Sequence, residues 1–233
     1  MTEPKGTQTI CLPDRESDLE AISHWAGRIR ATCRGIVDDL ITATSVTERN
    51  DLLENFADEL GHRRQVDRPL LASLLGLCAG TPPEKMSGDV SLWWAMHDTT
   101  IDIDSMLLKS NGDPGPLLVE KAVGAIEIWT EEELSSLHAL WHLAMGRNRA
   151  DLMERALGAA RWHVKELQPD NATNHPWAIH VFVALWRVDG DDAAHLHAQT
   201  LLNNCQVHMG RPDRFSACIL LDSAMCLETL GRT

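Results

Sequence analysis

The stretch from 130 to 167, TEEELSSLHALWHLAMGRNRADLMERALGAARWHVKEL, reads as two helices joined by a tight turn. The turn is GRN at 146–148, and Gly and Asn are typical turn residues. In the second half, apolar residues recur every three or four positions, which is the spacing of one helical face. The residues of this predicted inward face are Leu152, Ala156, Ala159, His163 and Leu167. The stretch therefore predicts an antiparallel αα-hairpin.

A similar hairpin follows. The tripeptide ALW at 139–141 recurs at 184–186, 45 residues later, and a Pro-Asp pair follows each copy. The second copy covers 177–208, and a third copy begins at Phe215. A period of this length is typical of repeated helix pairs. The sequence therefore predicts an all-α fold of stacked antiparallel αα-hairpins.

The composition favours the same fold class. Leu and Ala greatly outnumber Val and Ile, Tyr is absent and Phe occurs three times. Leu and Ala are strong helix formers, whereas β-branched and aromatic residues favour strands. We expect residues 1–15 to form a flexible N-terminal tail and residues 16–233 to form a single all-α helical-repeat domain.

These paired helices, with polar loops and Trp residues at their ends, resemble the α/α-toroid and α-solenoid superfolds. The resemblance covers 130–230 and implies either an open solenoid or a partly closed α/α toroid. The toroid class includes terpenoid cyclases and six-hairpin glycosidases, which place their substrate at one mouth of the barrel. The QxxxGxW repeat of the squalene-type cyclases is absent here, and so is a DxDD motif, since Ser105 follows DID at 102–104. No catalytic residue is therefore carried over from that class.

The charge balance excludes two classes of partner. The chain has 21 Lys and Arg against 34 Asp and Glu, a net charge of −13, and no basic run. Binding to nucleic acid or to an anionic membrane requires a positively charged protein surface. We therefore expect neither nucleic acid nor membrane as a partner.

The cysteines and the N-terminal residues indicate the compartment. None of the six cysteines forms a CxxC pair. Residues 1–14, MTEPKGTQTICLPD, lack the apolar core of a secretory signal, and no stretch approaches the ~18 apolar residues of a membrane helix. We therefore expect a cytoplasmic protein with reduced thiols.

A polar stretch supplies the candidate ligand site. The segment QPDNATNHPW at 168–177 joins the two predicted hairpins and holds more polar residues than helix capping requires. Stacked hairpins place equivalent helix ends side by side, so we expect this segment to meet the inward histidines of both second helices. The residues predicted to line one shared cleft are His163, Asn171, Asn174, His175, Trp177 and His208.

An alternative site uses metal chemistry. The pair His97-Asp98 follows an apolar helix, and His62 lies 35 residues upstream. This pattern resembles the HD-type metallohydrolases, which bind metal through a His, a His-Asp pair and a later Asp. The resemblance implies His62, His97 and Asp98 as metal ligands, with the fourth ligand left open.

Two further pairs of side chains have a helical spacing that could support metal binding or catalysis. His138 and His142 form an HxxxH pair on one helical face, a spacing that can chelate a metal. The zinc-protease form needs Glu directly after the first His, but Ala139 stands there, so ordinary interface histidines are the preferred interpretation. Cys205 and His208 are three residues apart, and we interpret them as a packed thiol beside a histidine rather than as a catalytic pair.

The functional expectation follows from the fold class and the polar loop. We expect a binding or scaffold module for a protein segment or a small polar ligand, with no cofactor. The alternative is a hydrolase, either metal-dependent and of HD-like type or using the mouth of a toroid.

Overall fold

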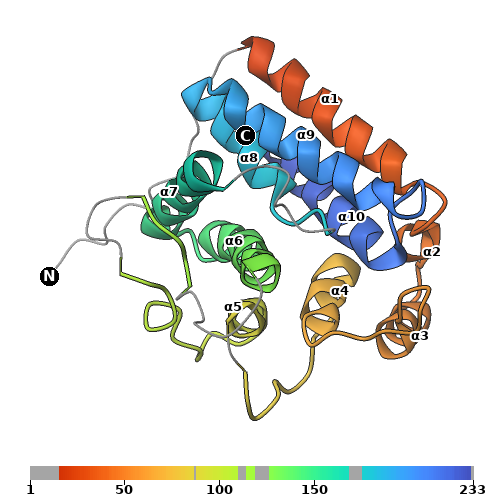
Figure 1. Cartoon of the computed structure of the whole chain (residues 1–233). Helices are drawn as coiled ribbons and strands as arrows, with labels where there is room; N and C mark the ends of the chain where they lie inside the picture. Colours follow the sequence, from red (N-terminus) through yellow and green to blue (C-terminus); the bar gives the residue numbers. More distant parts are fainter. Residues whose placement is uncertain (1–15, 87, 110–113, 119–125, 168–174, 232–233) are drawn as a thin grey trace, which may run out of the picture.

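The computed structural model describes residues 16–86, 88–109, 114–118, 126–167 and 175–231. Within these ranges the chain forms ten α-helices and no β-strand (Figure 1), which confirms the predicted all-α class. The segment 1–15, expected to be a flexible tail, lies outside the described residues. Each described helix is too short or too polar to span a lipid bilayer.

The hairpin expected over 130–167 is formed by α6 (Ile126–Gly146) and α7 (Ala150–Glu166), which pack against each other. Asn148 turns the chain between them with a φ of 51°, a left-handed conformation that Asn tolerates better than most residues. The predicted inward face of α7 is buried, since its members from Leu152 to His163 expose 3% or less of their surface.

The second hairpin consists of α8 (Ile179–Asp189) and α9 (Asp192–Val207). Gly190 ends α8 in the left-handed conformation, and the Asp191 side chain caps α9 by accepting a hydrogen bond from the Ala193 amide. The α8 helix is buried almost throughout its first two turns, whereas α9 buries one face only. The α8 helix therefore lies inside the molecule and α9 covers it.

The helix pair after the second hairpin joins the two ends of the described chain. The α10 helix (Arg214–Leu230) packs along α1 (Glu16–Cys33), the first helix of the described chain. Ile29 of α1 is fully buried at this contact, and Arg30 donates a bidentate hydrogen bond to Glu228. A helix thus follows the second hairpin near Phe215, and its partner comes from the other end of the sequence.

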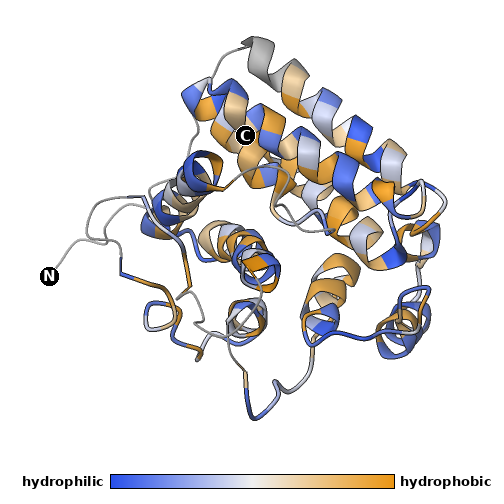
Figure 2. Cartoon of the chain, in the orientation of Figure 1, coloured by the Kyte–Doolittle hydropathy of each residue, from blue (hydrophilic) through white to orange (hydrophobic). Residues whose placement is uncertain are grey.

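Four shorter helices complete the structure: α2 (Asp38–Thr42), α3 (Val46–Asn55), α4 (Asp67–Leu75) and α5 (Asp89–Ala95). The α5 helix packs on α6, while α4 contacts α3, α5 and α10 (Figure 1). In Figure 2, α4 is largely hydrophobic and α3 mostly hydrophilic. Burial agrees with this difference, because α4 buries most of its residues, whereas only one residue of α3 is buried. The α4 helix thus brings its side chains against α10 beside the site described below.

The cap of α9 gives a local test of the fold. Replacing Asp191 with alanine is expected to lower the free energy of unfolding by about 1 kcal/mol, because the Ala193 amide loses its acceptor at the start of the helix. Urea denaturation measures the change. The matched variant Asp191→Ser keeps a capping oxygen, so its free energy of unfolding should fall by only about 0.3 kcal/mol. Equal losses in the two variants would show that the cap does not contribute.

Candidate functional site

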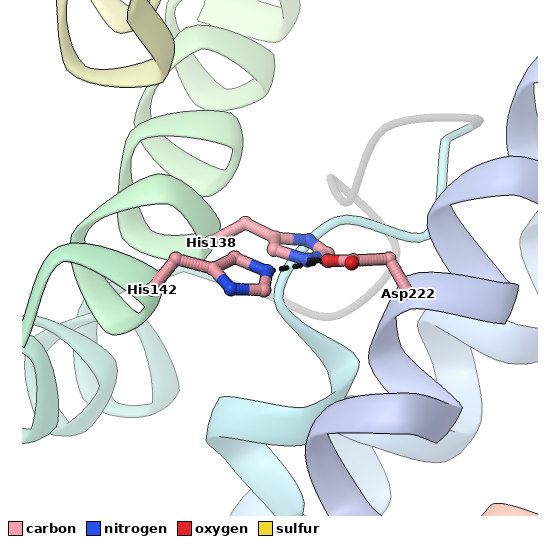
Figure 3. A group of neighbouring side chains, drawn as sticks. All are labelled: His138, His142 and Asp222. Carbon is pink, nitrogen blue, oxygen red and sulfur yellow. Dashed lines mark hydrogen bonds and ion pairs between the residues drawn. The ribbon is translucent and has the colours of Figure 1, made fainter. Parts of the chain in front are cut away.

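Two histidines and one aspartate meet in the core between α6 and α10 (Figure 3). His138 and His142 lie one turn apart on α6, and Asp222 faces them from α10. The Nε2 atom of His138 lies 2.7 Å from Oδ2 of Asp222, and Nε2 of His142 lies 2.5 Å from the same oxygen. The side chain of His138 is fully buried, whereas that of His142 keeps 20% of its surface exposed. We refer to these three residues as the His–Asp–His centre.

Local sequence explains how each side chain reaches the centre. Residues four apart on a helix project on the same side, so α6 presents both imidazoles in one direction. Their rings lie 5.5 Å apart between centroids and are nearly parallel, at 13°. Asp222 lies within the apolar run FSACILLDSAMCL at 215–227, and a buried carboxylate of this kind requires partners because desolvation of a charge is costly.

A backbone amide fixes the protonation of His138. The Ala178 N–H donates to Nδ1 of His138 over 3.2 Å, so Nδ1 is an acceptor and the ring proton lies on Nε2. That Nε2–H then donates to Asp222. Ala178 itself has a φ of 56°, the left-handed conformation, which costs energy for a residue with a Cβ atom. A strained residue at the start of α8 thus supplies the amide that orients the centre.

The charges of the centre are unequal. Burial is the largest single influence and tends to lower the pKa of His142, but the combined effects of Asp222 and Cys226 outweigh it and hold that pKa well above its usual value. Burial lowers the pKa of His138 despite the same carboxylate. For Asp222, burial tends to raise the pKa, yet the charge of His142 and both histidine hydrogen bonds hold it well below its usual range. At neutral pH the centre is therefore a His142 imidazolium, an Asp222 carboxylate and a neutral His138.

Aromatic side chains enclose the buried side of the centre. The ring of His180 on α8 lies 4.3 Å from that of His138 at an angle of 66°, and its Nδ1 pairs with the Ser223 hydroxyl at 3.2 Å. Trp93 and Trp177 also contact His138, with ring centroids 5.4 Å and 5.5 Å away. This shell excludes water on the His138 side, so only His142 faces outward.

A pocket of about 200 Å³ opens above His142 and Asp222. It lies between α4, α6 and α10, and its mouth is formed in part by the exposed side chains of Met225 and Thr229. The other residues that line it are Ser73, Trp141, Met145, Cys226 and Leu230. The centre is thus buried on one side and accessible through a small, largely apolar pocket on the other.

The centre is the only group of three metal-ligating side chains found among the described residues, and its ligand atoms all lie within 4.8 Å of one another. Its geometry nevertheless fits a metal poorly. A metal with bonds of about 2.0–2.1 Å holds neighbouring ligand atoms about 3 Å or more apart, whereas the nitrogen–oxygen distances here are 2.7 and 2.5 Å. A metal-bound histidine also donates from its other nitrogen, but Nδ1 of His138 accepts from Ala178. The centre is therefore a hydrogen-bonded ion pair.

The structure describes four of the six residues predicted to line one cleft, namely His163, His175, Trp177 and His208. His163 is fully buried and contacts Trp162 and Phe182, and its place in a ligand cleft stays a prediction. The spacing of apolar residues places His163 on the inward face of α7, and the neighbouring helices close this position off from solvent. His208 is exposed at the end of α9 and therefore does not share an environment with His163.

The loop residues of that set lie elsewhere. Asn171 and Asn174 fall outside the described residues. His175 and Trp177 lie close together, since both rings contact Phe215 at 4.9 Å and 5.5 Å. Trp177 also lines a second pocket, described below, and this part of the predicted site remains a prediction.

The three residues of the alternative metal site, His62, His97 and Asp98, do not form a group of metal ligands among the described residues. His62 is exposed and approaches Asp58. The Nε2 atom of His97 pairs with the Pro69 carbonyl at 2.8 Å, and Asp98 accepts hydrogen bonds from Thr100. Each side chain is used locally, and a metal site of HD type at these residues stays a prediction.

Sequence reasoning found the His138–His142 pair but assigned it to an ordinary interface, and it missed Asp222 entirely. One feature of the sequence pointed to that residue. Asp222 is the only charged residue in the run FSACILLDSAMCL, and a single carboxylate on the apolar face of a helix has to be neutralised by a partner.

No family model, no curated protein and no solved structure matches the chain. The geometry of the centre and its pocket is therefore the basis of the functional conclusion.

Proposed function

We propose that this protein is a binding module whose ligand is a small, largely apolar molecule with a hydrogen-bond acceptor, held in the pocket above the His–Asp–His centre. The observation that carries the proposal is the position of His142, a charged imidazole with access to the pocket. Its Nε2 pairs with Asp222, whereas its Nδ1 has no hydrogen-bond partner among the described residues. A cationic N–H donor is thus available to an acceptor atom of the ligand.

The walls of the pocket define the rest of the ligand. Trp141, Met145, Met225 and Leu230 offer apolar surface around a few polar groups, which is the usual composition of a small-molecule site. Methionine side chains adapt to the shape of their contacts, so the two methionines suit an irregular apolar body. The Asp222 carboxylate and the net charge of −13 favour a neutral acceptor, such as a carbonyl, over an anion.

A hydrolase based on Cys226 is less well supported than binding. The Cys226 thiol lies 3.7 Å from Nε2 of His142, the same nitrogen that Asp222 uses. In a nucleophile–base–acid triad the two partners contact opposite nitrogens of the imidazole. Burial also raises the pKa of Cys226, although the charge of His142 opposes this, and so the reactive thiolate is disfavoured.

We also propose a closed, toroid-like arrangement of helices as the scaffold of this site. In its support, α5, α6, α8 and α10 contact one another in succession, and α4 contacts both α10 and α5. The α7, α9 and α1 helices pack on this series as the partners of α6, α8 and α10. In this proposal the hairpins α6–α7 and α8–α9 are copies of one repeat, and α10 with α1 forms the third helix pair of the ring.

Filling the pocket tests the binding proposal. Thr229 is exposed at the mouth, and Thr229→Trp should place an indole across the opening. Acetanilide, benzamide and cyclohexanone serve as probes at millimolar concentration, with chemical shifts of the Met145 and Thr229 amides as the readout. We expect at least one probe to shift these signals in the natural sequence, and Thr229→Trp to abolish the shift.

The matched control is Thr200→Trp. Thr200 donates its hydroxyl to the carbonyl four residues earlier, as Thr229 does, but it does not line the pocket. Probe binding should be unchanged in this variant and weakened about tenfold, or 1.4 kcal/mol, by His142→Gln, which removes the charged donor. Binding that survives Thr229→Trp, or no binding of any probe, would overturn the proposal.

A further inference from the structure

We propose that the groove between α2, α3 and the start of α10 is a docking site for a basic polypeptide segment of a partner protein. This surface, which we call the α2–α3 groove, encloses a volume of about 650 Å³. It is separate from the pocket above the His–Asp–His centre and shares no lining residue with it. The inference is therefore independent of the proposed small-molecule function.

Carboxylates dominate the charged lining of the groove. Asp39, Glu48 and Asp51 all line it, and Arg214 is the one basic side chain there. The guanidinium of Arg214 already pairs with Asp39 at 2.5 Å and lies 5.6 Å from the Phe56 ring centroid. Asp51 forms no ion pair with any described residue. A cation that enters the groove thus meets unneutralised negative charge.

Apolar surface provides the floor of the groove. Leu52 and Phe56 line it, and Phe56 is 5% exposed, so its ring forms part of the wall rather than a mobile flap. An occupant with both cationic and apolar side chains matches this surface.

The acidic surface continues past the start of α10. Arg214 lines the α2–α3 groove, and the next residue, Phe215, lines a second pocket of about 270 Å³. The carboxylates of that pocket belong to Asp89, Glu131 and Glu132, and its basic side chain is Arg64, which pairs with Asp58 at 3.0 Å. Burial, together with the negative charges of Glu132 and Glu131, raises the pKa of Asp89 to about 6. The pocket thus has three carboxylates against one guanidinium, an excess of negative charge that favours a cationic ligand.

Two pockets that are lined by consecutive residues of α10, Arg214 and Phe215, favour a segment of chain over a single small cation. One Lys or Arg side chain fills at most one of the pockets, whereas a segment with several basic residues can reach both at once. The net charge of −13 adds long-range attraction for a basic partner and repels nucleic acid and anionic lipid. The charges and the shape of the surface thus agree on a basic polypeptide.

Fluorescence anisotropy with a labelled peptide tests this inference on the full chain. The probe is a synthetic nonapeptide that alternates Lys-Arg pairs with Leu, and its counterpart replaces every basic residue with Glu. We expect the basic peptide to bind and the acidic peptide not to bind. Replacing the Leu residues with Ser should weaken binding, because the floor of the groove is apolar.

Two variants with the same charge change locate the binding site. The groove variant combines Asp51→Lys with Asn55→Lys, and both positions line the groove. The control combines Asp192→Lys with Asn203→Lys, two exposed positions on α9. Both raise the net charge by three, and we expect the groove variant to weaken binding at least tenfold and the control less than about twofold. Circular dichroism melting confirms that each variant folds.

Equal losses in the two variants would show attraction to the overall charge and would overturn the inference, as would no binding of the basic peptide. Acetanilide at saturating concentration should leave peptide binding unchanged, because the groove and the small-molecule pocket share no residue. Failure of the groove and failure of the proposed small-molecule function are thereby distinguished.

Discussion

Replacing Asp222 with asparagine is expected to lower the free energy of unfolding by about 3–5 kcal/mol, because it removes the counter-charge of a buried ion pair. In the natural sequence this carboxylate accepts hydrogen bonds from His138 and His142 at the same oxygen. The asparagine has nearly the same shape, so the loss reports charge and not packing. Either His142 keeps its proton without a counter-charge, or it gives up a proton that the fold holds strongly. Urea denaturation at pH 7 measures the change.

A surface pair provides the control for this substitution. Asp189 pairs with Arg161 at 2.6 Å, and both side chains are partly exposed. Asp189→Asn should therefore cost less than about 1 kcal/mol. The double variant Asp222→Asn with His142→Gln should lose much less than the sum of its single variants, because each single change leaves the other charge unpaired. Strictly additive losses would contradict a coupled centre.

Replacing His197 with phenylalanine is expected to reduce the acid sensitivity of the fold. Burial lowers the pKa of His197 to about 4, well below the 6.5 of an exposed histidine, so the unfolded chain binds a proton that the folded chain does not. Stability is therefore lost as pH falls from about 6.5 toward 4, at about 1.4 kcal/mol per pH unit. His197 stacks on Phe182, with ring centroids 4.2 Å apart, so a phenylalanine fits the same contact.

Urea denaturation at pH 6.5 and 4.5 measures this dependence. Between these values the natural sequence should lose about 2–3 kcal/mol more than His197→Phe. Buried carboxylates with raised pKa values, such as Glu133 at about 7, change stability in the opposite direction, but they are present in both proteins and cancel in the difference. The control variant His24→Phe introduces the same phenylalanine at an exposed histidine position. Identical profiles for His197→Phe and the natural sequence would show that His197 is not the source of acid sensitivity.

The helices of the C-terminal half could be predicted well because their pattern is local. The spacing of Leu152, Ala156 and Ala159 reports which side of α7 is buried, and all three residues are buried. The turns at 146–148 and at Gly190 are likewise visible as Gly and Asn in the sequence. The pairing of α1 with α10 could not be predicted, since periodicity shows that a helix has an apolar face but not which helix covers it.

The site was less predictable for the same reason. His138 and His142 could be placed together because both lie on one helix. Asp222 is 84 residues from His138 in the sequence and reaches the two histidines only through tertiary packing. His163 lies on the predicted inward face of α7 and is fully buried, but such a face does not distinguish a sealed core from the wall of a pocket. Both nitrogens of His163 are buried without a hydrogen bond to a described residue. The presence of a polar side chain on the inward face therefore does not indicate that a ligand can reach it.

The protonation state of the two α6 histidines tests the central claim most directly. Long-range nitrogen–proton NMR of the imidazole rings at pH 7 distinguishes the neutral tautomers from the imidazolium. We expect His142 to carry protons on both nitrogens and His138 to carry one proton, on Nε2, with neither pattern altered by an equimolar amount of Zn²⁺. A neutral His142, a proton on Nδ1 of His138, or a shift of both rings on addition of Zn²⁺ would contradict a charged donor at the base of the pocket.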